Sequence, residues 1–111
     1  MGFSHLTLVV SDLDRMTNFL THIFGAKEIY SSDDATYSIS KEKFFLIADI
    51  WVAIMEGEAL PQKTYNHIAF KIKEEEFREY EKRVRVLGAD IKNGRSRVSG
   101  EGQSLYFYDY E

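Results

Sequence analysis

Hydrophobic and polar residues alternate along the first segment of the chain, Phe3 to Val10 (FSHLTLVV), which is rich in aliphatic and aromatic residues. This alternation predicts a β-strand with two different faces. The helix-packing face would hold Leu6, Leu8 and Val10, and the opposite face would hold His5, Thr7 and Val9.

The period then changes to that of an amphipathic helix that lies on a sheet. Ser11 is the expected N-cap and Gly25 the expected residue after the C-terminal end. The apolar positions at helical spacing are Leu13, Met16, Leu20 and Ile23.

Short β-like segments follow this helix, and they are separated by turn signals. Asp33-Asp34 marks one turn, and the charged residues Lys41-Glu42-Lys43 form a connection. Gly57 to Thr64, which holds the only proline, is the expected linker. The expected strands cover Ala26 to Ser31, Thr36 to Ser40, Phe44 to Ala48, and Ile50 to Glu56.

The whole pattern then restarts, with a period of about sixty residues. Tyr65 to Ile72 (YNHIAFKI) matches Phe3 to Val10 position by position, so that His67 takes the place of His5. The second helix repeats the apolar spacing of the first with Phe77, Tyr80, Val84 and Leu87, and it runs into Gly88 as the first runs into Gly25.

Duplication predicts an α+β fold: two tandem βαβββ units that form a cupped mixed sheet with the helices outside. We expect one domain over residues 1–111, with repeat one at about 3–56, a linker at about 57–64 and repeat two at about 65–111. Repeat two is shorter than repeat one by about eight residues. The second unit is therefore expected to be truncated at its C-terminal end.

Composition excludes several classes of protein. The formal net charge is −4 with the two signs interspersed, which does not fit a nucleic-acid partner. The sequence has no cysteine, so thiolate metal sites and a cysteine nucleophile are excluded. No apolar run reaches membrane-spanning length, so we expect a soluble, cytoplasmic protein without a membrane partner.

His5 and His67 are the candidate metal ligands. A single histidine is more often a packed or surface residue, but two at equivalent inward-facing strand positions favour a site for Mn²⁺, Fe²⁺, Ni²⁺, Cu²⁺ or Zn²⁺. His22 has no repeat partner, and we interpret it as structural.

At these residues the sequence resembles the vicinal oxygen chelate superfamily (glyoxalase, bleomycin resistance, dioxygenase), and within it the fosfomycin resistance hydrolases of the FosX kind. The segments that carry the resemblance are SHLT (4–7), SKEKFF (40–45), IMEG (54–57), YNHIAF (65–70) and GEGQSLYFYD (100–109). The resemblance implies a divalent metal, expected to be Mn²⁺, held by His5, His67 and a third ligand, a Glu, expected beyond Glu111. It also implies a homodimer whose sites are shared between subunits.

The resemblance gives Glu42 the role of a general base, which removes a proton from the water that attacks the epoxide of fosfomycin. Without it, a carboxylate between two lysines would be interpreted as a solvated turn. The phosphonate group of fosfomycin is expected to be held by charge and by hydroxyl groups, from Thr7, Lys92, Ser104 and Tyr106. A solvated basic loop explains Lys92 about as well as phosphonate binding does. Tyr65 either lines the substrate cavity or packs as a core aromatic residue.

The predicted function is therefore metal-dependent hydration of the fosfomycin epoxide, with Glu42 as base. One alternative is a thiol transferase of the same fold that opens the same epoxide. Another is a metal-free drug-binding protein of the same fold, and a lyase or isomerase for a different small substrate is a weaker third.

Overall fold

The computed structural model describes residues 1–33, 39–58, 60–62, 66–89, 91–92 and 106–107. The chain forms two compact units, Met1–Gln62 and Lys63–Tyr110. The boundary between them falls inside the segment that the sequence predicts as a linker. Each unit is described here by itself.

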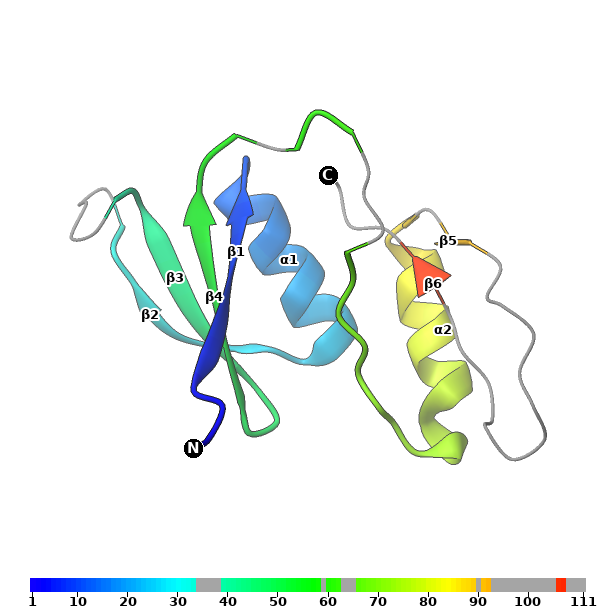
Figure 1. The fold of residues 1–111 in the computed structure, drawn as a ribbon. Coiled ribbons are helices and arrows are strands. Elements are labelled where there is room, and N and C mark those ends of the chain that lie inside the picture. Colours follow the sequence, from blue (N-terminus) through cyan, green and yellow to red (C-terminus); the bar gives the residue numbers. More distant parts are fainter. Residues whose placement is uncertain (34–38, 59, 63–65, 90, 93–105, 108–111) are drawn as a thin grey trace. The chain divides into compact units, whose positions relative to one another are not determined.

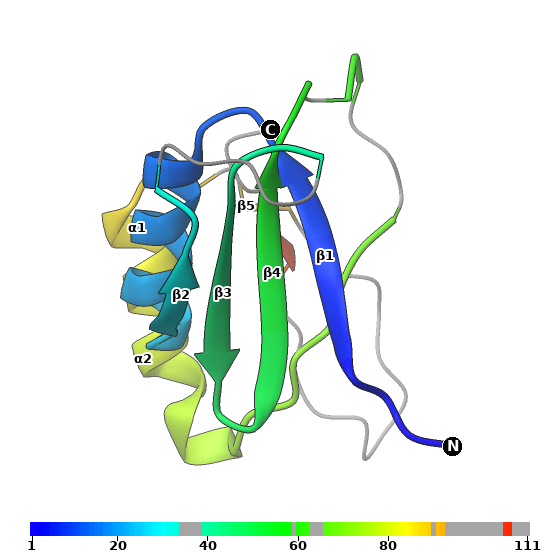
Figure 2. The ribbon, with the colours of Figure 1, turned by 90° about the vertical axis from the view of Figure 1, so that its left-hand side faces the viewer.

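Unit one is built around a mixed sheet of four strands, β1 (His5–Val10), β2 (Lys27–Ser31), β3 (Glu42–Ile47) and β4 (Ile50–Glu56). Their order across the sheet is β1-β4-β3-β2 (Figure 2). β1 runs parallel to β4, and the other two neighbouring pairs are antiparallel. A parallel pair needs a crossover connection, and here that connection contains the helix α1 (Leu13–Phe24) together with β2 and β3.

Helix α1 lies along one face of this sheet (Figure 1). Its N-cap is Asp12, whose carboxylate accepts a hydrogen bond from the Arg15 backbone N–H at 3.0 Å, so the predicted cap, Ser11, is wrong by one residue. Gly25 ends the helix with φ at +63°, as predicted, in the left-handed region that favours glycine. The helix buries Met16, Phe19, Leu20 and Ile23.

The core of unit one lies between α1 and the sheet. Alternate residues of the strands are buried there, as strand geometry requires when one face is covered. On the sheet side the buried residues are Val10, Phe45, Ile47, Val52 and Ile54. The predicted division of the first strand is confirmed, because Leu6, Leu8 and Val10 are more buried than His5, Thr7 and Val9.

The secondary structure predicted for Glu42 is wrong. The sequence places it in a charged connection before a strand at Phe44, whereas it is the first residue of β3 and pairs with Met55 of β4. Strand pairing extends over polar residues when the neighbouring strand offers its backbone hydrogen bonds. The expected strand at Thr36–Ser40 lies partly outside the described residues, and Ile39 and Ser40 are not in a strand.

Unit two contains a short 3-10 turn η1 (Glu74–Glu76), helix α2 (Phe77–Val86) and the short pair β5 (Ile91–Lys92) and β6 (Tyr106–Phe107). Val84 is buried on the predicted apolar face of α2. Gly88 follows the helix with φ at +70°, so both helices run into a left-handed glycine, as the repeat predicts.

The predicted strand at Tyr65–Ile72 does not form in the described part of the chain. Tyr65 lies outside the described residues, and residues 66–73 belong to neither a helix nor a strand. A strand needs a neighbour for its backbone hydrogen bonds, and an alternating pattern alone does not provide one. The α+β class is confirmed: the described residues contain two helices and a four-stranded mixed sheet. In the part that the structure describes, no helix has the length and apolar character needed to cross a membrane.

Candidate active site

The candidate site residues of unit one lie on the sheet face that points away from α1, which we call the distal face. Strand register defines its members, because residues paired across neighbouring strands point to the same side. His5 pairs with Trp51, Thr7 with Ala53, and Val9 with Met55. From β3 the distal face receives Glu42, Phe44 and Leu46, and from β2 it receives Tyr30, which pairs with Phe44.

His5 begins β1 at the edge of the sheet and is exposed. Its ring packs against Phe44, with 5.8 Å between the ring centroids and 58° between the planes. The Ser4 hydroxyl lies 3.0 Å from Nδ1 of His5. When Nδ1–H donates to Ser4, the lone pair of Nε2 remains for a metal, which is the usual arrangement of a ligating histidine.

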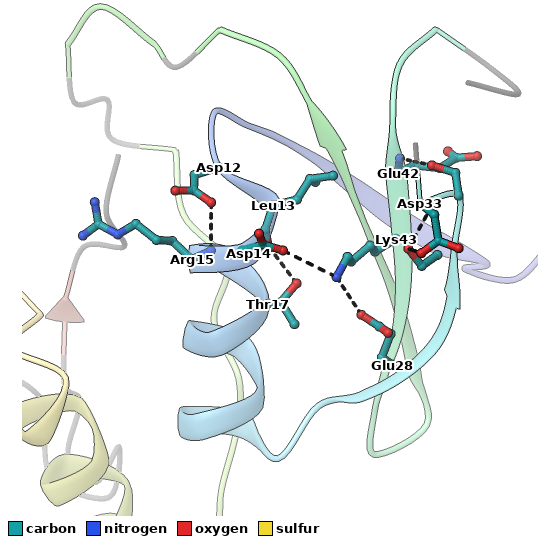
Figure 3. A network of polar contacts seen from close by, with 11 residues as sticks. Asp12, Leu13, Asp14, Arg15, Thr17, Glu28, Asp33, Glu42 and Lys43 are labelled. Carbon is teal, nitrogen blue, oxygen red and sulfur yellow. Dashed lines mark hydrogen bonds and ion pairs between the residues drawn. The ribbon is translucent and has the colours of Figure 1, made fainter. Parts of the chain in front are cut away.

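Glu42 lies on the same face, in β3, where it pairs with Met55 near the opposite end of β4 from the Trp51 that pairs with His5. Its backbone is held by the flanking strands: its N–H donates to the Ser32 hydroxyl at 2.9 Å, and its carbonyl accepts from the Ser32 N–H at 3.0 Å. On the β4 side, the Glu56 N–H donates to the Lys41 carbonyl at 2.8 Å. The Glu42 side chain is half-buried and starts from a well-fixed backbone (Figure 3).

Lys43 turns to the other face of the sheet, toward α1. Its ammonium lies 3.0 Å from a Glu28 carboxylate oxygen and 4.0 Å from an Asp14 oxygen (Figure 3). The predicted charged run is therefore divided by the pleat. The ion pairs of Lys43 form on the helix side, whereas the Glu42 carboxylate is directed to the distal face.

The register also sets the spacing between His5 and Glu42. His5 of β1 lies opposite Trp51 of β4, and Glu42 of β3 lies opposite Met55 of β4. Strand β4 therefore runs between them. Two inter-strand steps and four residues along a strand separate their Cα atoms by roughly 16 Å. The two side chains therefore do not contact each other.

The remaining predicted site residues are Thr7, which lies in unit one, and residues that lie in unit two or outside the described residues. Among the described residues, Thr7 is exposed beside His5 on the distal face, and His67 is exposed in a segment without regular structure. Lys92 and Tyr106 pair with each other through β5 and β6, and their side chains are not described. Tyr65 and Ser104 lie outside the described residues.

Metal-binding groups are not gathered into one cluster in the described ranges, where no set of three His, Asp or Glu side chains could hold an ion. The donor chemistry of His5 alone fits a transition metal, because it is an exposed imidazole with one ring nitrogen beside a hydroxyl.

Sequence reasoning missed three residues of this region. Trp51 is 40% exposed on the distal face, and Met55 pairs with Glu42 on that face. The period-two pattern of β4, with Val52 and Ile54 on the buried side, carries that signal. Ser32 holds Glu42, and only the fold brings these two residues together.

The chain is similar to known proteins over nearly its whole length. The family model described as "Glyoxalase/Bleomycin resistance protein/Dioxygenase superfamily" matches residues 2–110. Fosfomycin resistance protein FosX of Listeria innocua is 62% identical over 110 residues, which are 99% of this chain and 83% of the relative. Metallothiol transferase FosB of Bacillus licheniformis is 32% identical, over 98% of this chain and 69% of the relative.

A solved structure is similar over nearly the whole chain. It is a glutamate-to-glutamine variant of fosfomycin resistance protein FosX from Listeria monocytogenes, complexed with Mn(II) and 1S,2S-dihydroxypropylphosphonic acid. The TM-score is 0.88 at 55% identity, with 98% of this chain and 82% of that chain covered. These matches confirm the resemblance predicted from the sequence. The chain belongs to the glyoxalase/bleomycin resistance protein/dioxygenase superfamily.

Proposed function

We propose that this chain is a metal-dependent fosfomycin resistance enzyme that adds water to the epoxide of the antibiotic. The observation that carries the proposal is 62% identity to a fosfomycin resistance protein FosX over 99% of this chain. The function and the Mn²⁺ cofactor predicted from the sequence agree with the relatives, one of which was solved with Mn(II).

Water is the nucleophile in this proposal, and a relative's ligand supports it. The solved FosX structure holds a dihydroxypropylphosphonic acid, and a vicinal diol is what an epoxide becomes when water is added. The water oxygen forms a bond to one epoxide carbon while the bond from that carbon to the ring oxygen breaks. The water loses a proton, and the ring oxygen gains one.

Glu42 is the base that takes the proton from water. Its carboxylate is directed to the same face as His5, and its backbone is fixed on both sides. A positioned carboxylate can supply roughly 10²- to 10⁴-fold in rate by this means. The separation of Glu42 from His5 leaves space for the substrate between the base and the metal.

His5 and His67 would hold the metal. The bound ion would supply Lewis-acid polarisation of the epoxide and phosphonate oxygens. In a homodimer whose sites are shared between subunits, residues of both chains would contribute to one metal site. The exposed apolar residues Val9 and Trp51 on the distal face support such a pairing of chains.

The phosphonate would be held by Thr7, Lys92, Ser104 and Tyr106, with Tyr65 lining the cavity. Thr7 is two residues from His5 in the same strand and on the same face, so it lies within the same site. A hydroxyl and an ammonium suit the charged oxygens of a phosphonate.

The test is diol formation from fosfomycin by the purified protein. With Mn²⁺ and without any thiol, we expect the ³¹P NMR signal of the antibiotic to be replaced by that of the diol. A chelator should stop the reaction, and His5→Ala should weaken Mn²⁺ binding, measured by EPR of the free ion. Binding of the antibiotic without turnover would refute the enzyme and favour a drug-binding protein.

A second candidate is the thiol transferase, because FosB proteins also match, at about half the identity of the FosX relatives. Its signature would be a strict requirement for a thiol such as cysteine or glutathione. Product analysis separates the two, since the transferase yields a thioether and the hydrolase yields a diol.

A further inference from the structure

We propose that Ser32 is a positioning residue for the base Glu42, an inference that rests on the proposed function. Its side chain is 5% exposed, and among the described residues it is the buried polar one. A polar group is buried at a cost unless it is hydrogen-bonded, so its partner indicates its role. That partner is the backbone of Glu42.

Ser32 forms two hydrogen bonds with the same residue. Its N–H donates to the Glu42 carbonyl at 3.0 Å, and its hydroxyl oxygen accepts from the Glu42 N–H at 2.9 Å. In a regular antiparallel pair, the second bond would go to a backbone carbonyl. The serine hydroxyl takes the place of that carbonyl.

The replacement occurs where β2 ends. The ladder between β2 and β3 closes with Ser31 opposite Lys43, and the chain then turns at Asp33, which has φ at +54°. A chain that turns away carries its carbonyl out of the ladder. The Ser32 hydroxyl keeps the first residue of β3 bound to β2 after the backbone has begun to leave.

The opposite side of this strand end is also held by a serine. The Ser40 hydroxyl donates to the Glu56 carbonyl at 2.6 Å, and the Glu56 N–H donates to the Lys41 carbonyl. Glu42 is therefore fixed between β2 and β4 at the point where its carboxylate leaves the sheet. A misplacement of about 1 Å at a reacting group can cost 10²-fold in rate, so this anchoring affects the reaction.

The test compares two serine variants that each lose one hydroxyl. Ser31→Ala is the matched control, because the Ser31 hydroxyl contacts Asp33 and not Glu42. We expect Ser32→Ala to lower kcat for diol formation by about tenfold, with KM and Mn²⁺ affinity within about twofold of wild type. Ser31→Ala should leave all three unchanged.

A double-variant cycle separates positioning from a general structural effect. In the Glu42→Gln background, Ser32→Ala should cause no further loss of kcat, because the residue on which it acts is no longer a base. An equal loss in both backgrounds would overturn the inference. Amide hydrogen exchange gives a readout without substrate: the residue 42 N–H should exchange faster in Ser32→Ala and not in Ser31→Ala, and equal protection in all three proteins would also overturn it.

The two proposals fail in different ways. If the wild-type protein with Mn²⁺ makes no diol, the proposed function is refuted at the baseline. If the wild type makes diol and Ser32→Ala retains the full kcat, only the role of Ser32 is refuted.

Discussion

Glu42→Gln is the most informative single change, because it removes a base while it preserves the shape of the side chain. The backbone bonds to Ser32 and the pairing with Met55 involve no carboxylate atom, so both remain possible in the variant. The half-buried side chain stays polar and of equal size. We therefore expect the free energy of unfolding to change by no more than about 0.5 kcal/mol.

The effect on rate should be far larger. Loss of a general base costs roughly 10²- to 10⁴-fold, or about 3 to 5 kcal/mol in the activation barrier. Among the described residues that the strand register places on the distal face, Glu42 is the carboxylate, and Phe44 and Met55 lie next to it. Because Glu28 and Asp14 lie on the helix side with Lys43, they cannot replace it.

The assay is kcat for diol formation without thiol, followed by ³¹P NMR, with Mn²⁺ affinity measured in parallel. Glu28→Gln is the matched control, since it neutralises a carboxylate on the opposite face and should leave kcat within about twofold of wild type. A Glu42→Gln enzyme that retains a third or more of wild-type kcat, with normal folding, would refute the role of Glu42. Activity that survives in this variant only with added thiol would favour the transferase.

Three further predictions concern the fold of unit one, whose unfolding in urea can be followed by the fluorescence of Trp51, the only tryptophan. Ile54→Ala should destabilise the unit by about 2 to 5 kcal/mol, because Ile54 is fully buried between the sheet and α1; a smaller loss than for Ile54→Val would contradict this packing. Gly57→Ala should cost up to about 1 kcal/mol, since the added Cβ would lie 2.5 Å from Cγ1 of Val9 and this exposed side chain would have to move, whereas Gly2→Ala, with nothing within 4 Å, should be neutral. Ala48→Gly should raise the free energy of unfolding by up to about 1 kcal/mol, because Ala48 has φ at +54° in the turn between β3 and β4. A lower urea midpoint than that of wild type would contradict this.

Sequence patterns sufficed wherever a residue's role follows from its near neighbours in the chain. The period-two division of Phe3 to Val10 predicted which side chains of β1 are buried, and Gly25 and Gly88 predicted where the two helices end. These features depend on local backbone geometry, because side-chain direction repeats every two residues in a strand and every 3.6 residues in a helix. The family was also accessible, because its motifs lie in short segments such as SHLT and YNHIAF.

The sequence could not decide which residues face each other across strands. Glu42 reads as part of a solvated turn between two lysines, and only pairing with β4 places it in a strand and turns Lys43 to the opposite face. The same is true of Ser32, ten residues away in the chain, whose hydroxyl meets the Glu42 backbone because β2 and β3 are neighbours. Local patterns in the sequence were enough for the division of β1 into two faces, the glycine after each helix and the family. Tertiary structure decided the register, because hydrogen bonds between strands join residues that no local pattern relates.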